Sequence, residues 1–300
     1  DVEINKKEFL KHKGPLILAC NHPNSFLDAI ILCTLFDGTI YSLARGDALK
    51  NKTASKFLRL FKMFPVYRVS EGVENLEENY TTFKLCKDLF KKNGIVLIFS
   101  EGRCVNEWHL RPLKKGTARL AISSWQDGID VQVLPVAINY SSFSRFGKNL
   151  KLSFGDVITK EDINYKDTDG SAIRQFNETL NQQLSKYVYE IDETDKATLQ
   201  KLFYVKQSAV KKILLFAPAA IGYLLHASLF YLLKWLGDKL IKEDGHADSK
   251  IVAFLFLIYP LFLLVLSFLL LFFTGSWFAF GIVLALPFTA WAFVHLKPQL

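Results

Sequence analysis

The sequence lacks the residue patterns of several common enzyme and binding classes. No Gly-x-Ser-x-Gly segment occurs, so the nucleophile elbow of the α/β-hydrolases is missing. The six histidines show no paired ligand spacing, which argues against a metalloenzyme, and we expect neither a metal nor another cofactor. No nucleic-acid-binding motif and no signal peptide are visible. The sequence starts at Asp1 rather than at a methionine, so we expect a piece of the native N-terminus to be missing.

Cysteine is scarce, with four residues in a chain of 300. Their positions show neither the spacing of metal ligands nor the framework of a small secreted domain. We therefore expect reduced thiols in a cytosolic domain. The four are Cys20, Cys33, Cys86 and Cys104.

The charge balance is positive, and the apolar residues are unevenly spread. The net charge is +8, which suits an anionic partner such as a nucleic acid, a phosphate-bearing substrate or a membrane surface. Half of all residues are hydrophobic, and the last fifty residues are almost uncharged. Because no nucleic-acid motif is present, this apolar tail favours a membrane over a nucleic acid.

Two long segments near the C-terminus carry no Lys, Arg, Asp or Glu. They cover residues 251–273 and 277–296, twenty-three and twenty residues. At ~1.5 Å rise per residue each is long enough to cross a hydrocarbon core of ~30 Å. Only three residues separate them, so we expect a transmembrane helical hairpin over 251–296. Lysines on both sides of the hairpin place its two ends in the cytosol by the positive-inside rule.

A third apolar segment, residues 213–233, is ambiguous. It contains Pro218, Gly222 and His226, and lysines flank both of its ends. If it crossed the membrane, the lysines after it would lie outside, against the positive-inside rule. We expect an interfacial or re-entrant helix here. A third span, or a helix buried against the catalytic domain, is the alternative.

The first 190 residues read as an α/β domain. Short apolar or alternating runs predict strands, and amphipathic stretches between them predict helices packed on a sheet. A charged connecting segment, 191–212, should link this domain to the membrane region. A short edge strand is expected within residues 1–13, and further strands at 16–20, 40–45, 95–99, 131–138 and 150–155. Helices are expected at 51–63, 74–93 and 171–191. Because a proline inside a central strand is unusual, Pro135 predicts a bulge or a strand end.

The strand at 16–20 runs directly into a polar loop that contains His22 and Asp28. With His22 in the loop and Asp28 in the first turn of the next helix, the chain can fold back and bring them together. A carboxylate on one imidazole nitrogen fixes the tautomer and supports a general base at the other. Alternatively, Asp28 only caps the helix together with Ser25 as N-cap, and His22 is an ordinary loop histidine.

Two further sites stand at places where ligands gather. Glu101, Gly102 and Arg103 follow the strand at 95–99, and ligands of open α/β sheets collect at such strand ends. Lys115, next to Gly116, begins a predicted helix, where free N–H groups and the positive end of the dipole favour a phosphate. Lys114 is the reserve candidate, and one of the two lysines is expected to be merely solvated.

These motifs together resemble the glycerolipid acyltransferase superfamily. Asn21-His22, five residues and Asp28 resemble its His/Asp motif, which usually has four intervening residues; five are found in fungal-type glycerol-phosphate acyltransferases and related bacterial enzymes. Phe99 to Cys104 resembles Phe-Pro-Glu-Gly-Thr-Arg, with serine for proline and arginine one place early. Arg68 matches the arginine of a Pro-Val-x-Arg segment. The resemblance covers residues 1–190, with the motifs in the family's order.

The resemblance implies acyl transfer from acyl-CoA or acyl-carrier protein to the hydroxyl of a glycerol phosphate. It makes His22 the general base and Asp28 its orienting carboxylate. Substrate contacts are then expected at Asn21, Arg68, Glu101, Gly102, Arg103 and Lys115. Bacterial relatives of this plan favour 1-acyl-glycerol-3-phosphate (lysophosphatidic acid) as acceptor and phosphatidic acid as product, whereas the five-residue spacing favours glycerol-3-phosphate itself.

Three other readings of the sequence stay open. One is an O-acyltransferase that uses a non-phosphate acceptor such as an amino-acid lipid. Another is a thioester or lipid hydrolase, although its nucleophile is missing. The last is a membrane adaptor that has kept the fold without the activity. For the acyltransferase, we expect a bacterial inner-membrane protein whose catalytic domain lies on the cytoplasmic face of the bilayer.

Overall fold

The computed structural model of this chain describes residues 1–45, 62–66, 76–145, 147–166, 169–240 and 247–296. The chain divides into two units. The sheet unit consists of Glu3–Asn139 and Lys151–Asp192. The helical unit consists of Asp1–Val2, Tyr140–Leu150 and the chain from Glu193 onward.

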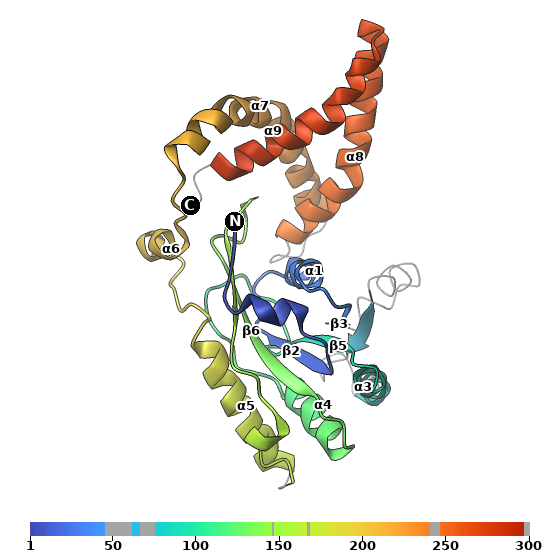
Figure 1. Cartoon of the computed structure of the whole chain (residues 1–300), viewed down its shortest axis with the longest axis vertical. Helices are drawn as coiled ribbons and strands as arrows, with labels where there is room; N and C mark the ends of the chain where they lie inside the picture. Colours follow the sequence, from blue (N-terminus) through green and yellow to red (C-terminus); the bar gives the residue numbers. More distant parts are fainter. Residues whose placement is uncertain (46–61, 67–75, 146, 167–168, 241–246, 297–300) are drawn as a thin grey trace. The chain divides into compact units, whose positions relative to one another are not determined.

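A seven-stranded sheet forms the centre of the sheet unit, with the strand order β1-β7-β6-β2-β5-β3-β4 (Figure 1). β2 lies in the middle and pairs in parallel with β5 and β6, while β3 pairs in parallel with β4 and β5. The predicted α/β class with a mostly parallel sheet is therefore confirmed. The strands are β1 (Val2–Ile4), β2 (Leu16–Cys20), β3 (Ile40–Arg45), β4 (Met63–Val66), β5 (Ile95–Phe99), β6 (Gln132–Tyr140) and β7 (Leu150–Phe154).

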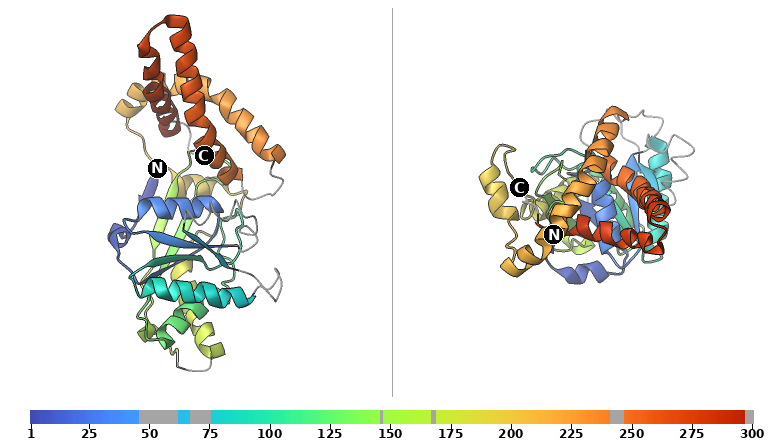
Figure 2. Two further views of the ribbon diagram at one scale, coloured as in Figure 1. Left: turned by 90° about the vertical axis from the view of Figure 1, so that its right-hand side faces the viewer. Right: turned by 90° about the horizontal axis from the view of Figure 1, so that it is seen from above.

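Helices cover both faces of the sheet (Figure 1 and Figure 2). α1 (Phe26–Leu35) lies on one face, and α3 (Leu76–Phe90), α4 (Lys115–Gln126) and α5 (Asp169–Ser185) lie on the other. Every residue of β2 is therefore buried, which explains why its sequence is an unbroken apolar run. Shorter helices among the described residues are η1 (Lys7–Lys11), η5 (Lys160–Asp162) and α6 (Lys196–Phe203).

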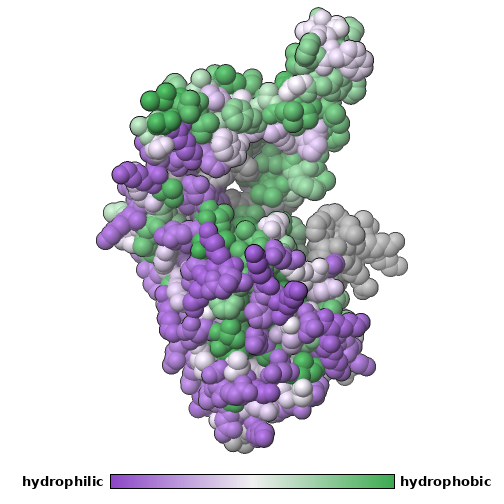
Figure 3. Space-filling view, in the orientation of Figure 1, coloured by the Kyte–Doolittle hydropathy of each residue, from purple (hydrophilic) through white to green (hydrophobic). Residues whose placement is uncertain are grey.

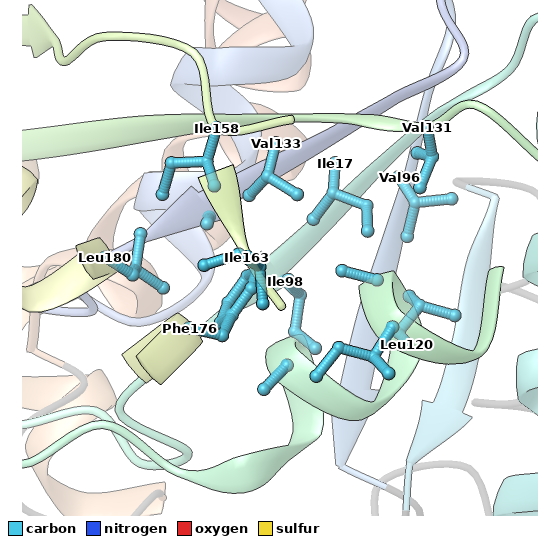
Figure 4. Packing of buried hydrophobic residues seen from close by; sticks show 14 of the residues in the cluster. Ile17, Val96, Ile98, Leu120, Val131, Val133, Ile158, Ile163, Phe176 and Leu180 are labelled. Carbon is cyan, nitrogen blue, oxygen red and sulfur yellow. The ribbon is translucent and has the colours of Figure 1, made fainter. Parts of the chain in front are cut away.

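The main hydrophobic core lies between the sheet and the three helices α3, α4 and α5 (Figure 4). Ile17 and Ala19 of β2 point into it, and the alternate residues of this strand point to the other face. From the helices, Leu120, Phe176 and Leu180 complete the packing, and all three are fully buried. This core holds the carboxyl ends of β2 and β5 side by side.

Pro135 corrects one detail of the sequence prediction. It lies inside β6, where it pairs with Ala19 of β2 in unbroken register, so no bulge interrupts the pairing with β2. Its carbonyl accepts a hydrogen bond from the N–H of Gly155, 2.9 Å away and just beyond the end of β7. Because the N and C=O of a strand residue face the same neighbour, the missing N–H of the proline points to where β7 has ended.

Several predicted helix bounds need correction. The predicted helix over 171–191 ends at Ser185 in the structure, and Ile191 instead forms a bridge with Trp108. The helix predicted over 74–93 is α3, which ends at Phe90 and is followed by Asn93 in a left-handed conformation. Residues 51–61 of the helix predicted over 51–63 lie outside the described residues, and Met63 belongs to β4.

The helical unit is built mainly from α7 (Ala209–Leu240), α8 (Ala247–Thr274), η6 (Trp277–Gly281) and α9 (Ile282–Leu296). Gly222 of α7 lets this helix approach α9 closely, because a Cβ there would lie 2.1 Å from the carbonyl oxygen of Thr289. His226 of α7 and Tyr259 of α8 share a hydrogen bond of 2.9 Å. The segment expected at 213–233 is thus part of a longer helix.

Within the part of the chain that the structure describes, three helical stretches are long and apolar enough to cross a membrane. They are Ala209–Lys239, Ser249–Thr274 and Trp277–Leu296. Many of their exposed side chains are large and hydrophobic, whereas the face of the sheet unit seen in Figure 3 is mostly hydrophilic. Exposed apolar surface on this scale indicates a membrane association. The predicted hairpin over 251–296 and the interfacial reading of 213–233 stay predictions.

Gly14 tests the packing at the start of β2. A Cβ at this position would lie 2.3 Å from the carbonyl oxygen of Gly94. This oxygen is a backbone atom, so it cannot move away as the end of a flexible side chain could. We expect Gly14→Ala to lower the free energy of unfolding by about 1–3 kcal/mol through overpacking. Thermal unfolding in a mild detergent measures the change.

Gly170→Ala is the matched control, because a Cβ at Gly170 meets nothing within 4 Å and this residue lies in α5. Alanine there should change stability by less than about 1 kcal/mol, and toward a more stable protein. Equal losses in the two variants would contradict the close backbone approach at Gly14.

Candidate active site

Asn21 is the first residue of the candidate site, and its side chain forms hydrogen bonds with the backbone of the neighbouring strand β6. Its Nδ2 donates to the carbonyl of Ile138 at 3.1 Å, and its Oδ1 accepts from the N–H of Ile138 at 2.8 Å. The side chain is buried and both ends of the amide are used. These bonds fix the start of the loop, and the predicted substrate contact of Asn21 stays a prediction.

His22 and Asp28 meet as the sequence spacing allows. His22 Nδ1 lies 2.9 Å from Asp28 Oδ2, and the same oxygen accepts the N–H of Asn24 at 2.8 Å. Asp28 is fully buried in the first turn of α1, whereas 17% of the His22 side chain is exposed. A buried carboxylate needs such donors, so the pair is held firmly.

The expected capping by Ser25 takes a different form. Ser25 occupies the N-cap position of α1 with φ 55°, but its side chain makes no cap hydrogen bond. Its backbone N–H donates to the sulfur of Cys104, and its carbonyl accepts the N–H of Asp28. The Asp28 carboxylate bonds the N–H of Asn24, one residue before the N-cap.

Phe99 is a site residue that the sequence reading missed. Its ring stacks on the His22 imidazole with the ring centroids 3.8 Å apart and the planes 13° from parallel. Phe99 is the last residue of β5 and pairs with Cys20 of β2. A signal for it was present, since the carboxyl ends of two adjacent parallel strands bring Phe99 beside the residues that follow Cys20.

Asp28 contacts Nδ1 of His22, and Phe99 covers one face of the imidazole ring. Nε2 is therefore the ring nitrogen that can take part in a reaction. Among the described residues, none hydrogen-bonds to this nitrogen. A hydrogen bond from Nδ1–H to a carboxylate makes Nε2 the basic nitrogen of a neutral imidazole. The arrangement can therefore accept a proton from a bound hydroxyl.

Glu101 joins the two loops of the site. Its Oε2 accepts the N–H of His22 at 2.9 Å and its Oε1 accepts the N–H of Arg111 at 3.0 Å. Burial raises the pKa of this carboxyl, although the two N–H donors act in the opposite direction. Both carboxylate oxygens of Glu101 thus accept backbone N–H groups, and its expected substrate contact stays a prediction.

Two further hydrogen bonds connect the same two loops. Asn106 Nδ2 donates to the carbonyl of Pro23 at 2.7 Å, and the N–H of Val105 donates to the carbonyl of His22 at 3.3 Å. Burial raises the pKa of the Cys104 thiol to about 12, so this thiol stays protonated. All four cysteines of the chain are free.

The predicted phosphate-binding cations are placed unevenly. Arg68 lies outside the described residues. Arg103 is exposed, and Lys115 is exposed as the first residue of α4. Gly102 adopts φ +71°, and a Cβ there would lie 2.9 Å from Lys114 Cγ, so a larger residue would press on this lysine. The structure thus gathers Asn21, His22, Asp28 and Glu101.

The described part of the chain was compared with the ligand groups that a metal ion needs. Within it, no group of three or more His, Cys, Asp or Glu side chains is placed to hold a metal ion. The candidate site contains a His–Asp pair next to the end of β2.

The comparisons with known proteins match acyltransferases. A family model described as "Acyltransferase" matches residues 1–139, which include the His–Asp pair, Glu101 and Lys115. A 1-acyl-sn-glycerol-3-phosphate acyltransferase of Bacillus subtilis (strain 168) is 26% identical over 196 residues, 64% of this chain and 90% of that protein.

Among solved structures, the chain is similar to the 1-acyl-sn-glycerophosphate (LPA) acyltransferase PlsC from Thermotoga maritima. The two are 15% identical with a TM-score of 0.44, over 69% of this chain and 74% of that one.

Glu101→Gln tests the joint between the two loops. A glutamine can accept one of the two N–H bonds, but it turns an NH₂ group toward the other donor. We expect a loss of about 1–3 kcal/mol in unfolding free energy, measured by thermal unfolding. Glu107→Gln is the control, because Glu107 only forms a partly exposed ion pair with Arg111 and should cost under about 1 kcal/mol.

Glu101→Gln also tests how the contribution of Glu101 to stability depends on pH. Because the folded pKa of Glu101 is raised above its usual 4.5, the fold prefers the protonated carboxyl. Its contribution to stability is full below 4.5 and decreases as the pH rises through the folded pKa. The stability advantage of the wild type over Glu101→Gln should therefore shrink as the pH rises above 4.5, and an advantage that grows would contradict the raised pKa.

Proposed function

We propose that this chain, which belongs to the glycerolipid acyltransferase superfamily and is an acyltransferase, converts 1-acyl-glycerol-3-phosphate into phosphatidic acid. The acyl donor is a fatty acyl thioester of CoA or of acyl-carrier protein. The observation that carries the proposal is the bond between His22 Nδ1 and the buried Asp28, which leaves Nε2 to act as a base. The name of the Bacillus relative supports this acceptor and a role in phospholipid biosynthesis.

In the proposed reaction, His22 Nε2 takes the proton from the acceptor hydroxyl as its oxygen attacks the thioester carbonyl. Asp28 holds the Nδ1–H and stabilises the imidazolium that forms. The tetrahedral intermediate then collapses, its carbon–sulfur bond breaks, and the imidazolium returns the proton to the leaving thiolate. The products are the ester and a free thiol. No acyl-enzyme intermediate is required.

The remaining predicted residues take supporting roles in this proposal. Arg68, Arg103 and Lys115 are the candidates for holding the acceptor phosphate. Asn21, Glu101 and Gly102 fix the two loops on which His22 and Lys114 stand. Their contribution is to the position of the base rather than to direct substrate contact.

Glycerol-3-phosphate is the second candidate acceptor, favoured by the five residues between His22 and Asp28. A hydrolase is disfavoured by the residues near the base. Ser100 Oγ is buried against Thr117 Oγ1 at 3.0 Å, and the Cys104 thiol is protonated at neutral pH. An amino-acid lipid acceptor would be distinguished by activity that does not need a phosphate.

We also propose that α7–α9 attach the enzyme to a bilayer, with the sheet unit on the cytoplasmic face of a bacterial inner membrane. The apolar spans and the lysines that flank them support this placement. It would bring the active site to the surface where lysolipid and acyl chains are found.

His22→Ala removes the proposed base and should lower kcat by about 10²–10⁴-fold or more. The measurement is thiol release from palmitoyl-CoA and from palmitoyl-acyl-carrier protein, with lysophosphatidic acid, glycerol-3-phosphate or no acceptor. Near wild-type turnover of His22→Ala would refute the mechanism, and release that is equally fast without acceptor would favour a hydrolase.

Asp28→Asn is expected to lower kcat by ~10²–10⁴-fold with a smaller change in KM, because it removes the charge that supports the imidazolium. His109→Ala is the control for histidine replacement. His109 pairs with Glu190 at the surface, and its loss should leave kcat within about twofold.

Membrane attachment is tested by fractionation of cells that express the full chain. We expect the protein to stay in the membrane pellet after high-salt and alkaline carbonate washes and to enter solution only with detergent. Release by salt alone would indicate electrostatic contact with the surface and would contradict insertion of α7–α9.

A further inference from the structure

Phe99 is the last residue of β5, and its side chain lies on the face of the sheet that α1 covers. Val96 and Ile98 of the same strand belong to the main core on the opposite face. Because successive side chains of a strand point to opposite faces, Phe99 points away from that core. Its side chain is only partly buried. The position of this ring therefore follows from contacts other than those of the main core.

The contact between Phe99 and His22 is a face-to-face stack. The ring centroids are 3.8 Å apart and the planes differ by 13°. Two flat rings in contact are already ~3.5 Å apart, so little offset is left between these two. Uncharged aromatic rings prefer an offset or an edge-on arrangement over this one. The stack therefore gives little electrostatic attraction while the imidazole is neutral.

A positive charge on the imidazole reverses this preference. The face of a phenyl ring attracts a cation that lies within ~6 Å of the ring centroid. The imidazolium that forms when His22 Nε2 takes a proton meets this condition, with its centroid 3.8 Å from that of Phe99. The contact is thus stronger in the charged state than in the resting state. An interaction that strengthens as the reaction proceeds raises kcat.

Backbone contacts hold Phe99 in register with His22. Phe99 pairs with Cys20 across the parallel strands β5 and β2. The N–H of Ser100, the next residue, donates to the carbonyl of Cys20 at 2.8 Å. Glu101 Oε2 then accepts the N–H of His22 at 2.9 Å. Neither ring can shift along the strands without breaking these bonds, so the stack is built into the fold.

Asp28 and Phe99 restrict different motions of the His22 ring. The hydrogen bond of 2.9 Å between Nδ1 and Asp28 Oδ2 holds one edge of the ring but leaves the ring free to tilt about that bond. A parallel phenyl face opposes this tilt. The two contacts together give Nε2 one direction, which a base needs if it is to meet a bound hydroxyl.

We propose that Phe99 is a positioning residue for proton transfer at His22, and that its ring fixes the imidazole plane and stabilises the imidazolium through its π face. The inference rests on the proposed function, in which His22 Nε2 takes the proton of the acceptor hydroxyl. The imidazolium later returns this proton to the leaving thiolate. Phe99 acts during the interval in which the ring carries the charge.

The first test replaces Phe99 in the full chain in detergent and measures thiol release with the thioester and acceptor that the wild type uses. Phe99→Leu keeps an apolar side chain but removes the π face, so it should lower kcat about tenfold with both KM values within about twofold. Phe99→Tyr keeps the face and should stay within about threefold of the wild type. A higher KM for the thioester with an unchanged kcat would assign the ring to the acyl chain and overturn the proposal.

Ring fluorination separates the electrostatic effect from the shape of the side chain. Phenylalanine with one, two or three ring fluorines has almost the same size, but each fluorine makes the face of the ring less negative. At Phe99 the logarithm of kcat should therefore fall stepwise, with thermal unfolding unchanged. The same replacements at Phe83, a partly buried residue of α3, are the matched control and should leave kcat within about twofold. A flat series at Phe99 would refute the proposal.

Alkylation of His22 by iodoacetamide separates failure of this inference from failure of the proposed function, because it needs no turnover. Nε2 forms a bond to the methylene carbon, the carbon–iodine bond breaks and iodide leaves, so the ring gains a positive charge. Mass spectrometry of the peptide that contains His22 gives the rate.

The outcomes of this alkylation are distinct. If the wild type is inactive with every donor and acceptor, but alkylation of His22 slows stepwise with fluorination of Phe99, the stabilising contact stands and the reaction is wrong. If alkylation is equally fast in the whole series, the contact does not stabilise the imidazolium and the inference fails, whether or not the protein is active.

Discussion

The carboxylate of Asp28 is fully buried, and the candidate site depends on how this charge is accommodated. Removing a carboxylate from water is costly unless donors surround it. The His22 ring and the N–H of Asn24 provide them on one oxygen, and both come from the loop immediately before α1. The loop therefore adopts its conformation because the carboxylate requires it, and the imidazole is placed as a result.

Glu101 plays a similar part for the second loop. Its two oxygens bind N–H groups on chain segments far apart in sequence, at His22 and Arg111. Asn21 does the same for the sheet by pairing with Ile138. Polar side chains near the base thus replace backbone partners where regular structure ends, which keeps a surface-accessible histidine on a rigid support.

Much of this arrangement was predictable because its signals are local. The apolar run of β2, the polar residues after it and the spacing of Asp28 predict the His–Asp contact. The stacking of Phe99 and the double use of Glu101 were missed, since they depend on strand neighbours. The helix predicted to 191 ends at Ser185, and Ile191 pairs with Trp108 instead, a contact that no local pattern contains.

The positive φ of Ser25 has a consequence for how this loop can change in length. One residue added inside α1 would rotate Asp28 by about 100° and turn it away from His22. The fifth residue between His22 and Asp28 must therefore be accommodated before the helix begins, where Ser25 adopts its positive φ. The loop before α1, rather than the helix itself, is therefore the place where the distance between these two residues can change while Asp28 keeps its orientation toward His22.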